Sequence, residues 1–113
     1  MATVYNLRVH KNNGWIGIEI PDSLQPFIND LLEWYSEDLQ SRNIPVLSRT
    51  IPPTAGGGDF RPIWLTGPFG LSTIGTCAAG PVVGAPHFYA RGKQAKLNQL
   101  EIDLVNWMQK FMQ

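Results

Sequence analysis

The stretch from Thr3 to Ile20 reads TVYNLRVHKNNGWIGIEI and gives the clearest indication of the fold. Apolar and polar residues alternate on both sides of Asn13-Gly14, which is the pattern of half-buried strands. Asn-Gly readily adopts the positive φ angles that tight hairpin turns require. We therefore expect an N-terminal β-hairpin. The inward side chains of its second strand are expected to be Ile16, Ile18 and Ile20.

An amphipathic helix is predicted after the hairpin, from Pro21-Asp22-Ser23 to about Ser41 or Asn43. Either Asp22 or Ser23 can cap this helix. Ser23 is the better candidate, because Pro26 then falls in the first turn, where a missing N–H costs no intrahelical bond. Apolar residues recur at three-and-four spacing, and acidic residues occupy other faces. The apolar stripe consists of Leu24, Phe27, Ile28, Leu31, Leu32, Tyr35 and Leu39.

The middle of the chain, from Ile44 to Pro86, has a different composition. It holds seven of the nine prolines and eight of the eleven glycines, which indicates turns joining short strands. Strands are expected within residues 44–51 and 61–66, and a loop within residues 54–59. Part of residues 71–79 is expected to be either a core strand or an exposed apolar surface that another subunit covers.

A second helix is predicted from near Gly92 to about Met112, at the end of the chain. Its apolar stripe consists of Leu97, Leu100, Leu104, Trp107, Met108 and Phe111. Together these elements predict one α+β domain over residues 1–113, with the hairpin, a helix, short strands in a Gly/Pro-rich middle and a C-terminal helix packed on the sheet. The alternative architecture is a hairpin that pairs with another subunit.

Composition and charge narrow the classes of function. Of 113 residues, 43% are hydrophobic and 16% are charged, against a typical charged share of roughly 25%. Nine basic residues balance nine acidic ones, which argues against nucleic acid as a partner. No charged residue occurs between Pro62 and Pro86, but Pro68 and Pro81 interrupt this segment, so no membrane span is expected. A single cysteine, Cys77, and a start without a signal-peptide pattern favour a cytoplasmic protein.

A protein partner, or self-association, is the leading interpretation. The aromatic residues exceed what a small core easily hides, and several flank turns or lie off the main helix stripe. The chain is therefore expected to be a non-enzymatic interaction or assembly subunit. A homo-oligomer, a small virion component and an inhibitor are the three kinds of protein that fit this description. The interface candidates are Trp34, Phe60, Trp64 and Phe69, together with Glu33 and Glu37.

The sequence offers three other kinds of site. In the first, the acidic helix docks on a basic partner. In the second, Cys77 and His87 form a catalytic pair with Asp59, although the uncharged surroundings of the thiol argue against it. In the third, Arg91 and Lys93 hold an anion at the start of the last helix. The residue pattern predicts no metal site and no cofactor.

Overall fold

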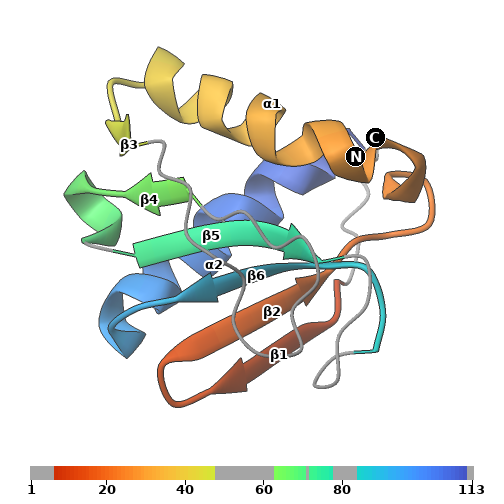
Figure 1. Ribbon diagram of the computed structural model, residues 1–113, viewed down its shortest axis with the longest axis horizontal. Coiled ribbons are helices and arrows are strands. Elements are labelled where there is room, and N and C mark those ends of the chain that lie inside the picture. The colour runs from red at the N-terminus through yellow and green to blue at the C-terminus, as the bar shows by residue number, and fades with distance from the viewer. Residues whose placement is uncertain (1–6, 48–62, 71, 78–83, 112–113) are drawn as a thin grey trace, which may run out of the picture.

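The fold is described by a computed structural model over residues 7–47, 63–70, 72–77 and 84–111. These residues form an antiparallel sheet of six strands in the order β1-β2-β6-β5-β4-β3, with two long helices (Figure 1). The strands are β1 (Val9–Asn12), β2 (Trp15–Glu19), β3 (Val46–Leu47), β4 (Ile63–Leu65), β5 (Ser72–Cys77) and β6 (His87–Arg91). The helices are α1 (Ile28–Ser41) and α2 (Gln94–Gln109), and short 3-10 helices span Gln25–Phe27 and Gly67–Phe69. The predicted α+β class is confirmed. The predicted loop at residues 54–59 and the interface candidate Phe60 lie outside the described residues.

The N-terminal hairpin forms as predicted. Asn12 pairs with Trp15, so Asn13 and Gly14 make the turn, and Gly14 has a φ of 88°. The side chains of β2 expected inside are buried, namely Ile16, Ile18 and the adjoining Ile20. The first strand extends to Asn12, because the turn is only two residues long.

The two predicted helices are present, but the start of α1 differs from the prediction. Ser23 is exposed, and within the described residues no side chain caps α1 or the 3-10 helix before it. The backbone turns at Pro21 instead, whose carbonyl accepts hydrogen bonds from the amides of Leu24 and Gln25. Pro26 therefore lies in the 3-10 helix, and α1 begins only at Ile28.

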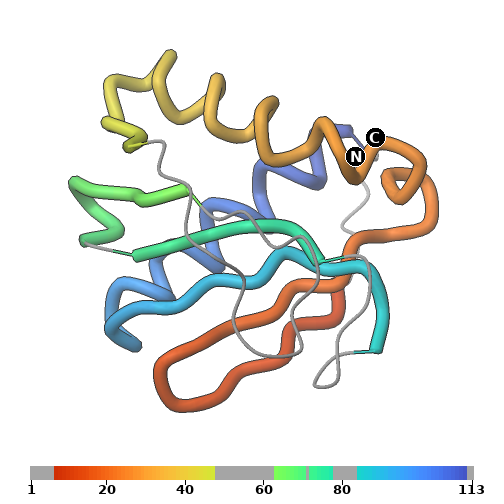
Figure 2. The backbone as a smooth tube through the Cα atoms, in the orientation of Figure 1, coloured from red at the N-terminus to blue at the C-terminus, as the bar shows by residue number. Residues whose placement is uncertain are grey.

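The central strand β6 was not predicted. It lies between β2 and β5, so the N-terminal hairpin joins a strand from near the other end of the chain (Figure 2). Phe88 and Ala90, which share one face of β6, are buried, and His87 on the opposite face is buried as well. The strands β3, β4 and β5 fall within the ranges expected for the middle of the chain.

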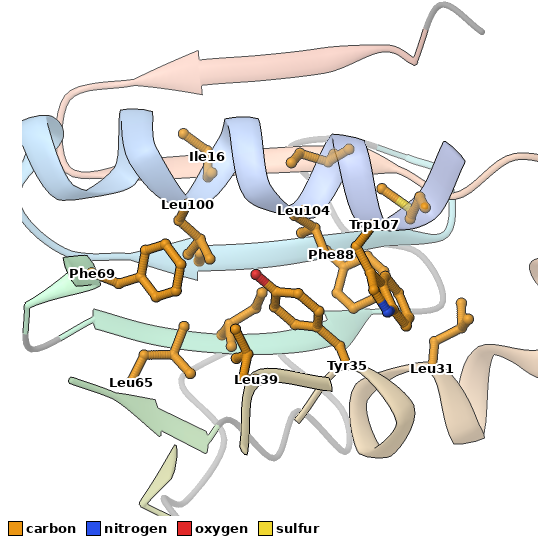
Figure 3. Close-up of a cluster of buried hydrophobic side chains, with 14 of the residues drawn as sticks. Ile16, Leu31, Tyr35, Leu39, Leu65, Phe69, Phe88, Leu100, Leu104 and Trp107 are labelled. Carbon is orange, nitrogen blue, oxygen red and sulfur yellow. The ribbon is translucent and has the colours of Figure 1, made fainter. Parts of the chain in front are cut away.

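Both helices contribute to one hydrophobic core with the sheet (Figure 3). The ring of Tyr35 on α1 lies 5.0 Å from that of Trp107 on α2 and 6.5 Å from that of Phe88 on β6. Leu39 from α1 and Leu104 from α2 belong to the same buried cluster. The C-terminal helix thus packs on the sheet as predicted. In the part of the chain that the structure describes, no helix has the length and apolar character needed to cross a membrane.

Three polar side chains link the two helices at the border of this core. The hydroxyl of Tyr35 donates to Asp103 at 2.6 Å, and the guanidinium of Arg42 donates to both oxygens of Asp103 at 2.8 and 2.9 Å. Burial alone would raise the pKa of Asp103, but the hydrogen bonds from Arg42 and Tyr35 outweigh it and hold that pKa below its ordinary value. Burial and the bond to Asp103 raise the pKa of Tyr35.

Candidate protein-contact surface

Three aromatic side chains meet at one end of the helix pair and reach solvent. Phe27 immediately precedes α1, Trp34 lies within it, and Phe111 follows α2. The ring of Trp34 lies 5.7 Å from that of Phe27 and 6.3 Å from that of Phe111. Phe27 is 44% exposed and Phe111 is 47% exposed, while Trp34 is half-buried. We call these three residues the aromatic patch.

Helical spacing explains how the aromatic patch forms. Phe27 and Trp34 are seven residues apart, which is close to two helical turns and places them on one side of the helix axis. Phe111 comes one turn after Trp107, and the two rings are 4.9 Å apart. Trp107 itself is only 4% exposed. The patch is therefore the outward continuation of the aromatic core, so its rings rest on a packed base.

An acidic strip runs along α1 beside the patch. It consists of Asp30, Glu33 and Glu37, all of them exposed. Asp30 precedes Trp34 by four residues and Glu37 follows it by three, so these two carboxylates are its neighbours on the helix surface. No lysine or arginine occurs between residues 28 and 41.

The acidic strip differs from the other carboxylates of the helices and hairpin. Glu19, Asp38, Glu101 and Asp103 each form an ion pair with a histidine, lysine or arginine. Among the described residues, no such pair involves any member of the strip. Its negative charge is therefore uncompensated by the described part of the chain.

The predicted interface residues fall into different environments. Trp34, Glu33 and Glu37 come together at the patch and strip. Trp64 is half-buried on β4, in a different part of the fold. Phe69 is 3% exposed and belongs to the core, so it offers no contact to a partner in this structure. The prediction missed Phe27 and Phe111, whereas Asp30 belongs to the acidic helix of the basic-partner alternative.

Phe27 and Phe111 could have been found from their positions on the two helical stripes. Both belong to apolar stripes, and both lie at helix ends, where a neighbouring element gives less cover. Asp30 precedes Trp34 by four residues on the same helix, and this spacing is the signal for its place beside the patch.

The candidate pair Cys77 and His87 is brought together by the sheet. The two are direct partners across β5 and β6, and Glu19 of β2 pairs with His87 on its other side. Nδ1 of His87 donates to the carbonyl of Ala85 at 2.6 Å. Burial raises the pKa of the Cys77 thiol, and burial lowers the pKa of His87 more than the Ala85 bond raises it.

These two shifts favour a neutral thiol beside a neutral imidazole. A thiolate–imidazolium pair requires the opposite shifts, with the thiol made more acidic and the histidine more basic. The arrangement is that of a packed cross-strand pair. Asp59, expected to orient the ring, lies outside the described residues.

The candidate anion site and metal chemistry gain no further support from the structure. Arg91 ends β6 and Lys93 flanks the start of α2, and both side chains are exposed. In residues 7–47, 63–70, 72–77 and 84–111, no three His, Cys, Asp or Glu side chains form a group that could hold a metal ion. The patch and the strip are thus the best-defined candidate surface.

Comparison of the chain with protein-family models, curated proteins and solved structures gave no match. The function is therefore argued from the chemistry of this surface.

Proposed function

We propose that the chain is a non-enzymatic protein-interaction subunit whose partner covers the aromatic patch. The observation that carries the proposal is the contact of Trp34 with both Phe27 and Phe111, two phenylalanines that are open to solvent. Exposed aromatic clusters are costly in water, and aromatic residues are enriched among those that dominate binding energy at protein interfaces.

The packing below the patch supports the same proposal. Phe111 rests on Trp107, which in turn contacts Tyr35 in the core. A surface held in place in this way loses little side-chain freedom on binding, which favours affinity. Homo-oligomers, small virion components and inhibitors all need such a contact surface. We place this function in the cytoplasm, because a lone cysteine requires no oxidising compartment.

Photo-cross-linking at single positions tests the proposal. A photoreactive phenylalanine analogue replaces Phe27 in one version of the protein and Ile102 in the matched control. Ile102 is 63% exposed on α2 and lies nine residues before Phe111, half a turn out of phase with it. It therefore samples the opposite side of that helix. Both versions are irradiated in extracts of the cells in which the protein naturally acts.

A defined adduct is expected from position 27 and not from position 102. An adduct of twice 12.6 kDa identifies a second copy as the partner, and any other mass identifies a different protein. Equal labelling from the two positions, or none from position 27, would contradict the proposal.

The non-enzymatic part of the proposal has its own test. Cys77→Ala removes the thiol from the cross-strand pair with His87. We expect this variant to give the same adduct from position 27 and to retain every biological effect of the wild-type protein. Loss of an effect with the adduct unchanged would point to chemistry at the thiol.

A further inference from the structure

We infer that the partner segment that covers the aromatic patch is a basic amphipathic helix, with apolar residues on one side and lysine or arginine beside them. This inference rests on the proposed function, because it specifies the chemistry of the partner at the same surface. It depends on the position of the acidic strip beside Trp34 and on the repulsion between its carboxylates, and the presence of acidic residues alone would not carry it.

Two members of the acidic strip, Glu33 and Glu37, are unfavourable for the isolated chain. Glu33 and Glu37 are four residues apart, a spacing at which like charges on a helix repel. Glu37 also lies in the second half of α1, where a negative charge opposes the helix dipole. Since the described residues provide no counter-charge, cations brought by a partner would relieve this repulsion.

The geometry matches this charge to an apolar contact. Asp30 and Glu37 are neighbours of Trp34 on the surface of α1, so the acidic strip borders the aromatic patch at that ring. A helical segment with apolar residues three and four positions apart can lay that side on the patch. Lysine or arginine next to its apolar side would then reach the strip.

A second copy of the chain fits the strip less well. Lys110, which precedes Phe111 in the sequence, already acts on Asp103. Arg91 and Lys93 lie before α2, whereas Phe111 follows it, and 16 residues of helix span about 24 Å at the usual rise. A symmetric dimer through the patch would bring a second acidic strip to the same contact.

Synthetic peptides provide the test. The probe is a helical peptide of about 18 residues with leucine at three-and-four spacing and lysine at the remaining positions. The matched peptide has glutamate in place of every lysine. Binding of both is measured by calorimetry at low and high salt to the wild-type protein and to three variants. The variants are Glu33→Gln/Glu37→Gln, Phe27→Ser/Phe111→Ser, and the control Asp22→Asn, which removes an exposed carboxylate outside the strip.

The lysine peptide is expected to bind the wild-type protein at least about tenfold more tightly than the glutamate peptide, with the advantage reduced at high salt. Glu33→Gln/Glu37→Gln should remove most of that advantage, and Asp22→Asn should not. Phe27→Ser/Phe111→Ser should abolish binding although the acidic strip is intact.

Failure of this inference and failure of the proposed function give different results. Equal binding of the two peptides, lost in Phe27→Ser/Phe111→Ser, overturns the basic partner and leaves the contact surface in place. A wild-type dimer by light scattering that the same variant dissociates also overturns it, because a second copy is then the occupant. Binding of the lysine peptide that ignores the aromatic substitutions overturns both, as does the absence of binding by either peptide.

Discussion

The two sides of α1 differ in almost every physical respect. On the side that faces the sheet, Leu31, Tyr35 and Leu39 are fully buried. The polar groups at its border, Tyr35 and Arg42, share the carboxylate of Asp103. On the outer side, aromatic rings reach solvent and the acidic strip lacks counter-charge among the described residues.

This difference separates the side chains of α1 that folding requires from those that it does not require. The inner side satisfies apolar burial and hydrogen bonding together, as expected of residues that specify a fold. The outer side carries aromatic rings that reach solvent and like charges four residues apart, and folding requires neither. Local departures of this kind are typical of functional surfaces, and this is why the contact is assigned there.

The largest effect is expected from breaking the inner side. Leu39→Ala removes a fully buried side chain and leaves a cavity, so the free energy of unfolding should fall by about 3 kcal/mol. Urea denaturation measures this change. Ile102→Ala, at an exposed position of α2, is the control and should change it by less than about 0.5 kcal/mol. If Leu39→Ala and Ile102→Ala lowered the free energy of unfolding by similar amounts, the distinction between the buried and the exposed sides of the helices would not hold.

A smaller loss is expected at the border of the inner side. Asp103→Ala leaves the hydroxyl of Tyr35 and the guanidinium of Arg42 without their acceptor, which should cost roughly 2 kcal/mol near neutral pH. The paired-charge control is Glu101→Gln, which breaks the more exposed pair with Lys11 and should cost less than about 0.5 kcal/mol.

The stability difference between the wild type and Asp103→Ala is predicted to depend on pH. Because the pKa of Asp103 is lower in the folded protein than its ordinary 3.8, its stabilising effect is complete above that value. The effect is lost as the pH falls through the lowered folded-state pKa. Denaturation curves of the wild type and Asp103→Ala should therefore converge in acid. A constant difference down to the most acidic pH at which both remain folded would argue against the link between Asp103 and the helices.

The smallest effect has the opposite sign. Glu33→Gln/Glu37→Gln removes the repulsion within the acidic strip, so the free energy of unfolding should rise by a few tenths of a kcal/mol, about 0.3. Thermal denaturation at low salt detects it, and added salt should reduce it. A loss greater than about 0.5 kcal/mol would show that the strip contributes to folding.

The elements with local signals were predictable from the sequence. Asn13-Gly14 specifies the hairpin through its own conformational preference, and the stripes around Leu31 and Leu100 specify the two helices. Trp34, Glu33 and Glu37 were predicted as interface residues because the helical period places them off the buried stripe. The structure places all three at the candidate surface, where their role stays a prediction.

Features that depend on distant parts of the chain were not predictable. The segment His87–Arg91 becomes the central strand because β2 and β5 both pair with it. Phe69 lies in a turn-like stretch and is buried, whereas Phe111 continues a helical stripe and is exposed. The exposure of each ring depends on which other elements pack against it, and the local pattern does not contain that information. The Ser23 cap was wrong because the carbonyl of Pro21 takes the bonds that open the helix.

The most direct test of the account is the free energy of unfolding of Phe27→Ser/Phe111→Ser, measured by urea denaturation beside the wild type. If the aromatic patch serves contact rather than folding, the loss should be about 2 kcal/mol for the two substitutions together, roughly 1 kcal/mol per ring, because each ring is almost half exposed. A loss of about 6 kcal/mol, twice that expected for the single core substitution Leu39→Ala, would make the patch part of the core and contradict its assignment as a contact surface.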